Sequence, residues 1–535
     1  MAAFINIRDL KNTPPLPRGH ATGIFLVVFL AFTAGGWSQV PINPFHEDSD
    51  EARPSPAQVQ RLQQKAKETP QSDSAHLDLG IALAETEQWQ QALREFDLAR
   101  KANPANAEAI YDAGLTHLMI ARTIRDRRSK LYGDELDHAQ QSLLRAYEIE
   151  PKLPRIHEHL GWLYHQIGDQ DSAIEQFRKE VAAEPSSAEA LNNLGTALAQ
   201  SERYQDAIKC YEDALAIDVE CTSCVLNLES AIRWQGDTGR TLKQYREQAE
   251  APSASPLAHL LYGMMLSVVK NQRDLAGAEL NEALSAHPKL AAAHYYIGQI
   301  QFENQDEAEA EKEYRMAIEL DPHRSEFYGS LATILMQQNK LQEAKAVVEK
   351  ALQLDPENSS LHYRYSLVLQ RSDEKTRAAA ERSETVRLQQ QDLQQSKLGL
   401  SLKRGIAALR AGDAQEAVRE LQTALTLDPN HPETNFYLGI ALSQTGDPSG
   451  SSQAFRKALE RRPESAEIHY NFGIALWREG ESAPAIAELR RTTEIRPEDA
   501  MAHCALGIAL LRTGYSAEGQ REIEHAQQLG ACAQK

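Results

Sequence analysis

The sequence predicts an all-α solenoid, in which antiparallel helix pairs stack along the chain instead of folding around one core. The main support is a period of 34 residues, at which prolines recur in two series and glycines in a third. The residues are Pro288, Pro322, Pro356, Pro429, Pro463, Pro497, Gly405, Gly439, Gly473 and Gly507. A fixed period of this length indicates stacked supersecondary units, each of which packs mainly on its neighbours.

The unit that begins at Asp73 shows what each repeat contains. Its apolar residues fall three or four positions apart in two blocks, which is typical of two amphipathic helices. Gly80 and Ala92 are small where the two helices are expected to approach closely, and Phe96 is expected to fill the space between units. Pro104 cannot continue a helix, so it is expected to turn the chain into the next unit.

These positions resemble the signature of the tetratricopeptide repeat family, from about Asp73 to Ala531. The resemblance implies a right-handed superhelical solenoid of about 13 units, with a concave groove that binds other proteins or peptides. Units are expected to begin near Asp73, Ala107, Pro154, Ala188, Thr222, Leu257, Ala291, Ser325, Ser359, Leu398, Pro432, Ala466 and Ala500.

Departures from the repeat divide the chain into segments. Residues 39–72 are rich in Pro and Gln and are expected to form a linker. An N-terminal array is expected over residues 73–250, with an Arg-rich insertion in its second unit. A seam at residues 251–256 is expected to separate it from a C-terminal array over residues 257–535, which includes a long polar helix near residues 374–397.

Residues 1–38 have the layout of a secretory signal. Basic residues come first, an apolar run from Ile24 to Ala34 follows, and small residues near Ser38 provide a cleavage zone. The run is shorter than the roughly 20 residues that a membrane-spanning helix needs. We therefore predict an exported protein, periplasmic or secreted. The alternative is an uncleaved inner-membrane anchor from Ala21 to Trp37.

The charge balance narrows the classes of partner. The chain carries 57 Lys and Arg against 76 Asp and Glu, which gives a formal net charge of −19. Such a surface repels phosphate backbones and anionic lipids. Nucleic acid is therefore excluded as an expected partner, and contact with a membrane is expected only through an N-terminal anchor.

No arrangement of residues predicts a catalytic, cofactor or metal site. Cys221 and Cys224 form a CxxC, but neither a second pair nor nearby paired histidines would complete a zinc site. Whether these two cysteines form a disulfide stays open, while Cys504 and Cys532 are isolated and expected to be simply packed. Six histidines share the fourth position of their units, which indicates a common structural role: His76, His157, His294, His362, His469 and His503.

The resemblance also implies which residues face the concave groove. In the family, the fifth, ninth and twelfth positions of each first helix face it, and the sixth can carry an Asn that grips peptide backbone, as in the O-linked N-acetylglucosamine transferase. The corresponding residues are Tyr111, Tyr295, Tyr363, Phe436 and Tyr470 (fifth), Trp162, Ile440, Ile474 and Ile508 (ninth), and Asn193, Asn227 and Asn471 (sixth). An exposed apolar and aromatic strip favours an interface. The alternative for each residue is burial between helices.

Taken together, the sequence predicts a scaffold or adaptor of the bacterial cell envelope that binds partner segments in its groove, and no enzyme. Two alternatives stay open. One is a non-catalytic subunit, or a relative, of a transferase that contains tetratricopeptide repeats. The other is a membrane-anchored regulator.

Overall fold

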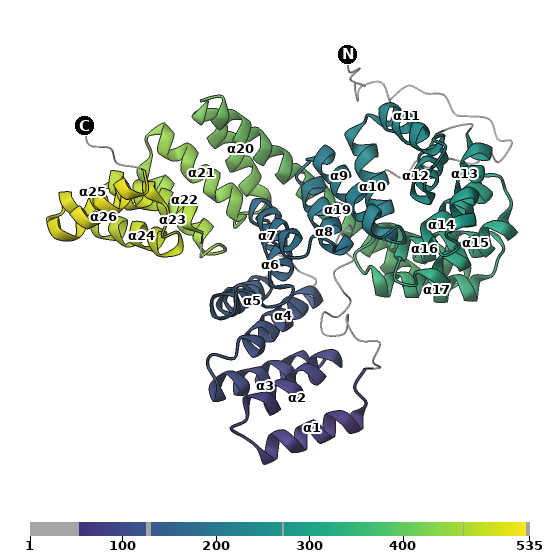
Figure 1. Cartoon of the computed structure of the whole chain (residues 1–535), viewed down its shortest axis with the longest axis horizontal. Coiled ribbons are helices and arrows are strands. Elements are labelled where there is room, and N and C mark those ends of the chain that lie inside the picture. Colours follow the sequence, from purple (N-terminus) through teal and green to yellow (C-terminus); the bar gives the residue numbers. More distant parts are fainter. Residues whose placement is uncertain (1–52, 125–129, 270–271, 464, 531–535) are drawn as a thin grey trace.

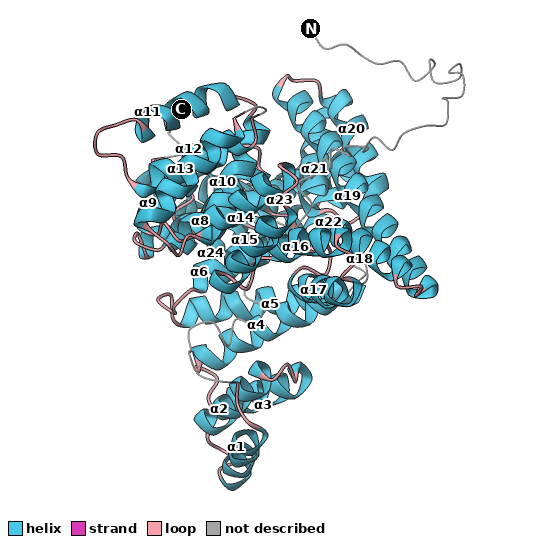
Figure 2. Cartoon of the chain, turned by 90° about the vertical axis from the view of Figure 1, so that its right-hand side faces the viewer, coloured by secondary structure: helices cyan, strands magenta, loops and turns pink. Residues whose placement is uncertain are grey.

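The computed structural model describes residues 53–124, 130–269, 272–463 and 465–530, and every regular element in these ranges is a helix (Figures 1 and 2). Within them, no helix is both long and apolar enough to cross a membrane. The predicted signal or anchor segment lies outside the described ranges.

Each unit pairs a first helix with an antiparallel second helix, which is the predicted all-α solenoid. The first helices are α2 (Asp73–Glu85), α4 (Ala107–Thr123), α6 (Ile156–Ile167), α8 (Ala188–Gln200), α10 (Thr222–Gln235), α12 (Pro256–Ser267), α14 (Ala291–Glu303), α16 (Ser325–Gln337), α18 (Ser359–Arg371), α21 (Pro432–Thr445), α23 (Ala466–Glu479) and α25 (Ala500–Arg512). The second helices are α3 (Trp89–Ala102), α5 (Lys130–Ile149), α7 (Gln170–Ala183), α9 (Tyr204–Ile217), α11 (Thr238–Ala249), α13 (Arg273–Ala286), α15 (Glu307–Leu320), α17 (Leu341–Leu354), α20 (Ala414–Leu427), α22 (Pro448–Leu459), α24 (Ser482–Ile495) and α26 (Ser516–Gln528). α1 (Pro56–Glu68) precedes the first unit.

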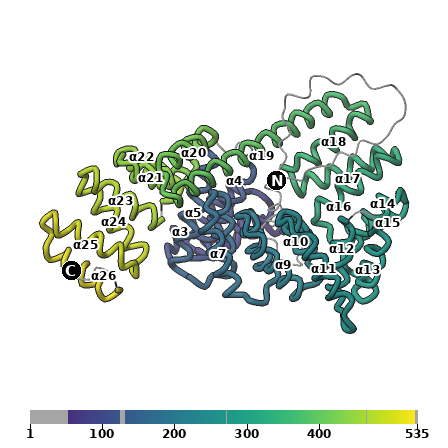
Figure 3. The backbone as a smooth tube through the Cα atoms, turned by 90° about the horizontal axis from the view of Figure 1, so that it is seen from above, coloured from purple at the N-terminus to yellow at the C-terminus, as the bar shows by residue number. Residues whose placement is uncertain are grey.

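The helix α19 (Lys375–Arg410) departs from this scheme, because it is the second helix of one unit and the first helix of the next. It runs straight through Leu398, where a new unit was expected to begin. The segment contains no proline, and nothing packs against Gly399 within 4 Å of a β-carbon built there. No residue therefore forces a turn at that point, and α19 forms a rod between the two arcs of the chain (Figure 3).

The repeated glycine marks the point where the two helices of a unit cross. A β-carbon at Gly80 would lie 2.5 Å from Cε1 of Phe96, and one at Gly439 would lie 2.6 Å from Cε1 of Phe455. Both rings are buried. The crossing distance and the large side chain of the second helix therefore require glycine, as the sequence pattern predicted.

The histidines at the fourth position tie the two helices of a unit together. Nδ1 of His469 lies 2.6 Å from Oε2 of Glu488 on the second helix, and Nε2 lies 2.8 Å from the Pro463 carbonyl oxygen of the preceding loop. The same pair of contacts recurs at His76, His294, His362 and His503, whereas His157 contacts Gln176. Burial opposes the charged form, but the hydrogen bonds to Glu488 and Pro463 raise the pKa of His469. The shared position has the structural role that the sequence indicated.

The largest hydrophobic cluster extends from Trp162 on α6 to Ala378 on α19. It includes Leu228 on α10 and Leu260 on α12. The predicted seam at residues 251–256 is the short connection between α11 and α12, and the core is continuous across it.

The middle of the solenoid closes on itself, because the segment from α19 to the loop after α22 returns to α5–α8, whereas α23–α26 lead away (Figures 1 and 3). Arg462, in the loop between α22 and α23, forms an ion pair with Asp169 at the start of α7. Nη1 of Arg461 lies 4.0 Å from Oδ1 of Asp137 on α5, and Lys403 on α19 pairs with Glu202. We call the contact formed by Arg461, Arg462, Asp137 and Asp169 the closing contact.

Candidate partner-binding site

A pocket of about 770 Å³ opens on the first helices of five consecutive units, α10, α12, α14, α16 and α18. Ile232, Met265 and Phe302 supply apolar walls, and Gln299 and Thr333 supply polar groups. The size of the pocket is that of a ligand site, and its wall combines apolar with polar and charged side chains.

Three arginines and two glutamates line the same pocket. Arg233 pairs with Glu229, and Nε of Arg273 lies 2.5 Å from Oε2 of Glu303. Arg364 differs from both, since no carboxylate of the described residues lies within ion-pair distance of it. Its Nη1 donates to the Gly329 carbonyl oxygen.

The environment of Arg364 makes its charge available to a ligand. Burial lowers the pKa of Arg364, while the nearby phenols of Tyr295 and Tyr314 act in the opposite direction. A largely buried cation without a counter-ion is costly, and a carboxylate brought by a partner would offset that cost. The arrangement can therefore hold one acidic group against α18.

Tyr295, predicted to face the groove, lies beneath the pocket instead. It is only 9% exposed, and its ring centroid is 4.8 Å from that of Phe327 in the next unit. Beside it, the Tyr296 hydroxyl donates to Oε2 of Glu229 over 3.0 Å. Trp162 and Phe436 are also core residues, at 4% and 3% exposure. Tyr295, Trp162 and Phe436 are therefore unavailable at a groove surface, because large side chains at their positions fill the space between units.

Other predicted groove residues lie at or near the surface. Tyr363 and Ile508 are exposed, whereas Ile440, Tyr470 and Ile474 are partly buried. Tyr470 and Ile474 pack with Trp477 onto the core formed by α24 and α25. We call Tyr470, Ile474, Trp477, Ile508 and Leu511 the C-terminal strip. Trp477 and Leu511 occupy the twelfth position of their units.

Comparison with family models decides what kind of repeat this is. Models described as "Tetratricopeptide repeat" match residues 47–120, 154–186, 188–221, 268–325, 325–358 and, in overlapping segments, 402–518. These segments cover more than half of the chain. The chain belongs to the tetratricopeptide repeat family.

Tetratricopeptide proteins of known identity resemble it over part of their length. "BBSome complex member BBS4" of Bos taurus is 26% identical over 254 residues, which are 48% of this chain and 46% of that protein. The "Peroxisomal targeting signal receptor" of Eremothecium gossypii is 23% identical over 221 residues, 37% of this chain and 38% of that protein. The chain thus spans less than half the length of these relatives. A solved structure, the APC/C hetero-tetramer Cut9–Hcn1, covers 90% of this chain and 97% of its own at 12% identity and a TM-score of 0.30.

The asparagines at the sixth tetratricopeptide position are engaged within the protein. Nδ2 of Asn193 donates to Glu158 over 3.0 Å, and Nδ2 of Asn227 donates to Asn192 over 3.0 Å. Asn471 donates to the Glu467 carbonyl of its own helix. Tyr111 is engaged as well, since its hydroxyl lies 2.7 Å from Nδ1 of His159. In this structure, Asn193, Asn227 and Tyr111 join neighbouring tetratricopeptide units.

Sequence reasoning missed the polar residues of the pocket. Ser330 and Arg364 stand at the sixth tetratricopeptide position and Gln299 and Thr333 at the ninth, which are the positions already expected to face the groove. The groove pattern consists of large apolar residues and asparagines, so Ser, Thr, Gln and Arg at these positions do not stand out in the sequence. Glu229, which also lines the pocket, replaces the crossing glycine of its unit. This departure from the repeat was the one feature that marked the pocket region in the sequence.

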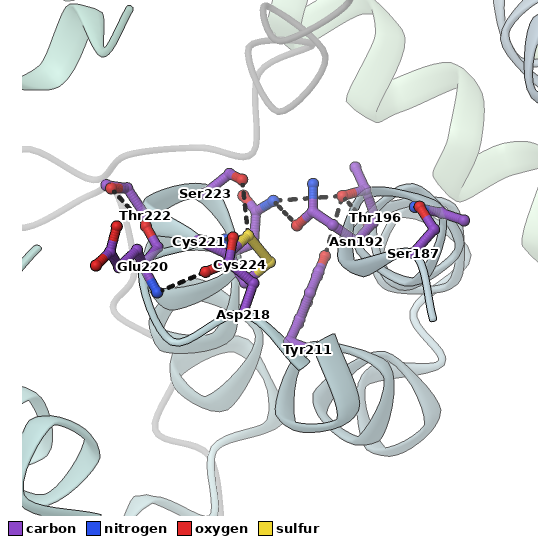
Figure 4. The surroundings of a disulfide bond; sticks show 12 residues. Ser187, Asn192, Thr196, Tyr211, Asp218, Glu220, Cys221, Thr222, Ser223 and Cys224 are labelled. Carbon is purple, nitrogen blue, oxygen red and sulfur yellow. Dashed lines mark hydrogen bonds between the residues drawn. A yellow bond between two sulfur atoms is a disulfide. The ribbon is translucent and has the colours of Figure 1, made fainter. Parts of the chain in front are cut away.

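The CxxC is a disulfide at the start of α10 (Figure 4). The Cα atoms of Cys221 and Cys224 are 5.4 Å apart, and Cys221 is the N-cap of the helix. Cys504 is also disulfide-bonded, so the expectation of an isolated, simply packed cysteine is wrong there. Cys532 lies outside the described residues. Cys210 is a free thiol.

Proposed function

We propose that this tetratricopeptide protein is a scaffold that binds a segment of a partner protein in the pocket on α10, α12, α14, α16 and α18. The observation that carries the proposal is Arg364, a largely buried guanidinium in that pocket without a carboxylate partner among the described residues. The segment would place an acidic side chain or a terminal carboxylate against Arg364. Its apolar residues would contact Val268 and Phe302.

Two further observations support a binding role. The chain carries a formal charge of −19, so the unpaired arginine in the pocket is a local exception that would direct an acidic group to one place. The relatives also support it, since one is named as a member of a complex and another as a receptor for a targeting signal. We propose no catalytic role for the chain.

Replacing Arg364 with methionine should weaken partner binding strongly, because methionine keeps an apolar stem and removes the charge. A hydrogen bond to a charged group contributes about 1.5–3 kcal/mol, so we expect capture to fall by about tenfold or more. The measurement is quantitative mass spectrometry of partners cross-linked to the full chain in its native host. Circular dichroism of the same variant verifies the fold.

The matched variant Tyr470→Ala separates the pocket from the C-terminal strip. If partners are lost with Tyr470→Ala and retained with Arg364→Met, the C-terminal strip is the binding surface and the pocket proposal is wrong. Retention of all partners by both variants would contradict both surfaces.

We propose further that the protein acts in the bacterial cell envelope after export. The layout of residues 1–38 motivates this location, and disulfides, which persist in oxidising compartments, support it. We expect the intact mass of the protein from its native host to show cleavage between about Ala34 and Val40. A retained Met1 on a protein in the membrane fraction would instead support the anchored regulator.

A further inference from the structure

A histidine occupies a core position of the second unit that is apolar in most other units. This position lies three residues after the crossing glycine of the first helix. It holds Leu or Ile in most units, at Leu83, Leu198, Ile232, Leu266, Leu335, Leu369, Leu442, Leu476 and Leu510. In α4 the residue is His117, and it is mostly buried. A polar ring in an apolar position needs a partner, because an unsatisfied buried polar group is costly.

Two side chains of α5 face this ring. Glu135 and His138 are three residues apart, so they lie on one face of their helix. Nδ1 of His117 lies 2.7 Å from Oε2 of Glu135, and the ring centroids of His117 and His138 are 4.9 Å apart. One potential ligand atom from each of the three side chains lies within 4.8 Å of the others.

This set differs from the histidine–glutamate pairs that recur along the solenoid. In most of those pairs the second ring nitrogen contacts a proline carbonyl, and they join one imidazole to one carboxylate. At His117 the third group is another imidazole from the same helix as the carboxylate, and one ligand atom of each group lies within 4.8 Å of the others. His525 likewise follows Glu522 by three residues and approaches His503 with ring centroids 4.5 Å apart, but there Nε2 of His503 contacts the Pro497 carbonyl oxygen.

We propose that His117, Glu135 and His138 bind one divalent transition-metal ion of the zinc class, which joins α4 to α5. Two imidazoles and a carboxylate form a known ligand set for zinc, with a fourth position left for water or another ligand. Zinc bonds of about 2.0–2.1 Å place tetrahedral ligand atoms roughly 3.3 Å apart. The three groups must therefore draw together slightly, and His138 is exposed and free to rotate.

Zinc titration of the full chain tests the proposal. The metal-stripped protein competes for Zn²⁺ with a chromophoric chelator, and Co²⁺ provides a visible spectrum that reports imidazole and carboxylate ligation. We expect one tight site per chain in the wild type. Because altering even an outer-shell contact costs about 10–100-fold in metal affinity, losing a ligand in His117→Leu should cost at least about 100-fold. Leucine is the residue of most other units, so this variant should keep its fold.

Two matched variants complete the design. Glu135→Gln keeps the hydrogen-bonding shape and weakens ligation, so it should also lose the tight site. His294→Leu removes an imidazole that contacts one carboxylate, Glu313, and the Pro288 carbonyl oxygen, and its zinc affinity should equal that of the wild type. Zinc should raise the melting temperature of the wild type and of His294→Leu but not of His117→Leu. Absence of a tight site in the wild type, or equal affinity in His117→Leu, would overturn the proposal.

Discussion

Replacing Arg462 with methionine will open the solenoid without melting its helices. The side chains of Arg462 and Asp169 are only 12% and 4% exposed, and burial lowers the pKa of Arg462 to about 10. Removing one partner of a buried ion pair costs about 3–5 kcal/mol, because the other charge stays buried and unpaired. The units on either side of the closing contact pack on their own neighbours, so the two sides can separate. Separation returns the unpaired charge of Asp169 to water and relieves that cost. Small-angle scattering should show a larger radius of gyration at unchanged helix content.

The control is Arg490→Met, which breaks an exposed ion pair with Glu518 between neighbouring units. Exposed pairs contribute little, so this variant should keep the wild-type radius of gyration. An unchanged radius for Arg462→Met would show that the closing contact does not hold the array closed.

Raising the pH should loosen the same region. Burial, and to a smaller extent the nearby charge of Asp171, raises the pKa of Glu433 to about 7. Glu433 therefore stabilises the closed form when protonated, at low pH, and this stability is lost as the pH rises towards and through 7.

The variant Gly439→Leu should destabilise the C-terminal units by at least about 1–3 kcal/mol. The added side chain would begin 2.6 Å from Cε1 of Phe455, a ring that is 1% exposed and cannot move aside. Hydrogen exchange of the full chain should show lost protection in α21 and α22, and thermal melting should shift to lower temperature.

Gly399→Leu is the matched control, because it makes the same substitution within a helix and meets nothing within 4 Å. Leucine has the higher helix propensity by up to about 1 kcal/mol, so this variant should be neutral or slightly stabilised. If the two variants melt alike, Gly439 does not lie at a tight helix crossing.

The 34-residue period predicted the helix pairs well, because one unit's sequence determines how its own two helices cross. Gly80 and the histidines at the fourth position have the local roles assigned to them, while the Phe96 ring, expected between units, packs against Gly80 of its own unit. The period wrongly predicted that a new helix begins near Leu398. The repeat register continues there, but no proline interrupts the chain, so α19 is unbroken.

The candidate site was harder to predict from the sequence. Register alone does not separate a groove residue from one that fills the space to the next unit, so Tyr295 and Phe436 were assigned to a surface they do not reach. The pocket around Arg364 combines five units and needs their relative placement. The closing contact is harder still to predict from the sequence, because it depends on the rotation accumulated over many units.

The closing contact also sets an order of folding. The extensive helix–helix contacts join helices that are near neighbours along the chain, so each unit can form as soon as the next is present. Asp169 and Arg462, by contrast, are separated by more than half the length of the chain. Joining such distant points costs conformational entropy while the intervening chain is flexible, and this cost becomes small once the intervening helices are rigid. We therefore expect ring closure to be the last step of assembly, preceded by an open, fully helical chain.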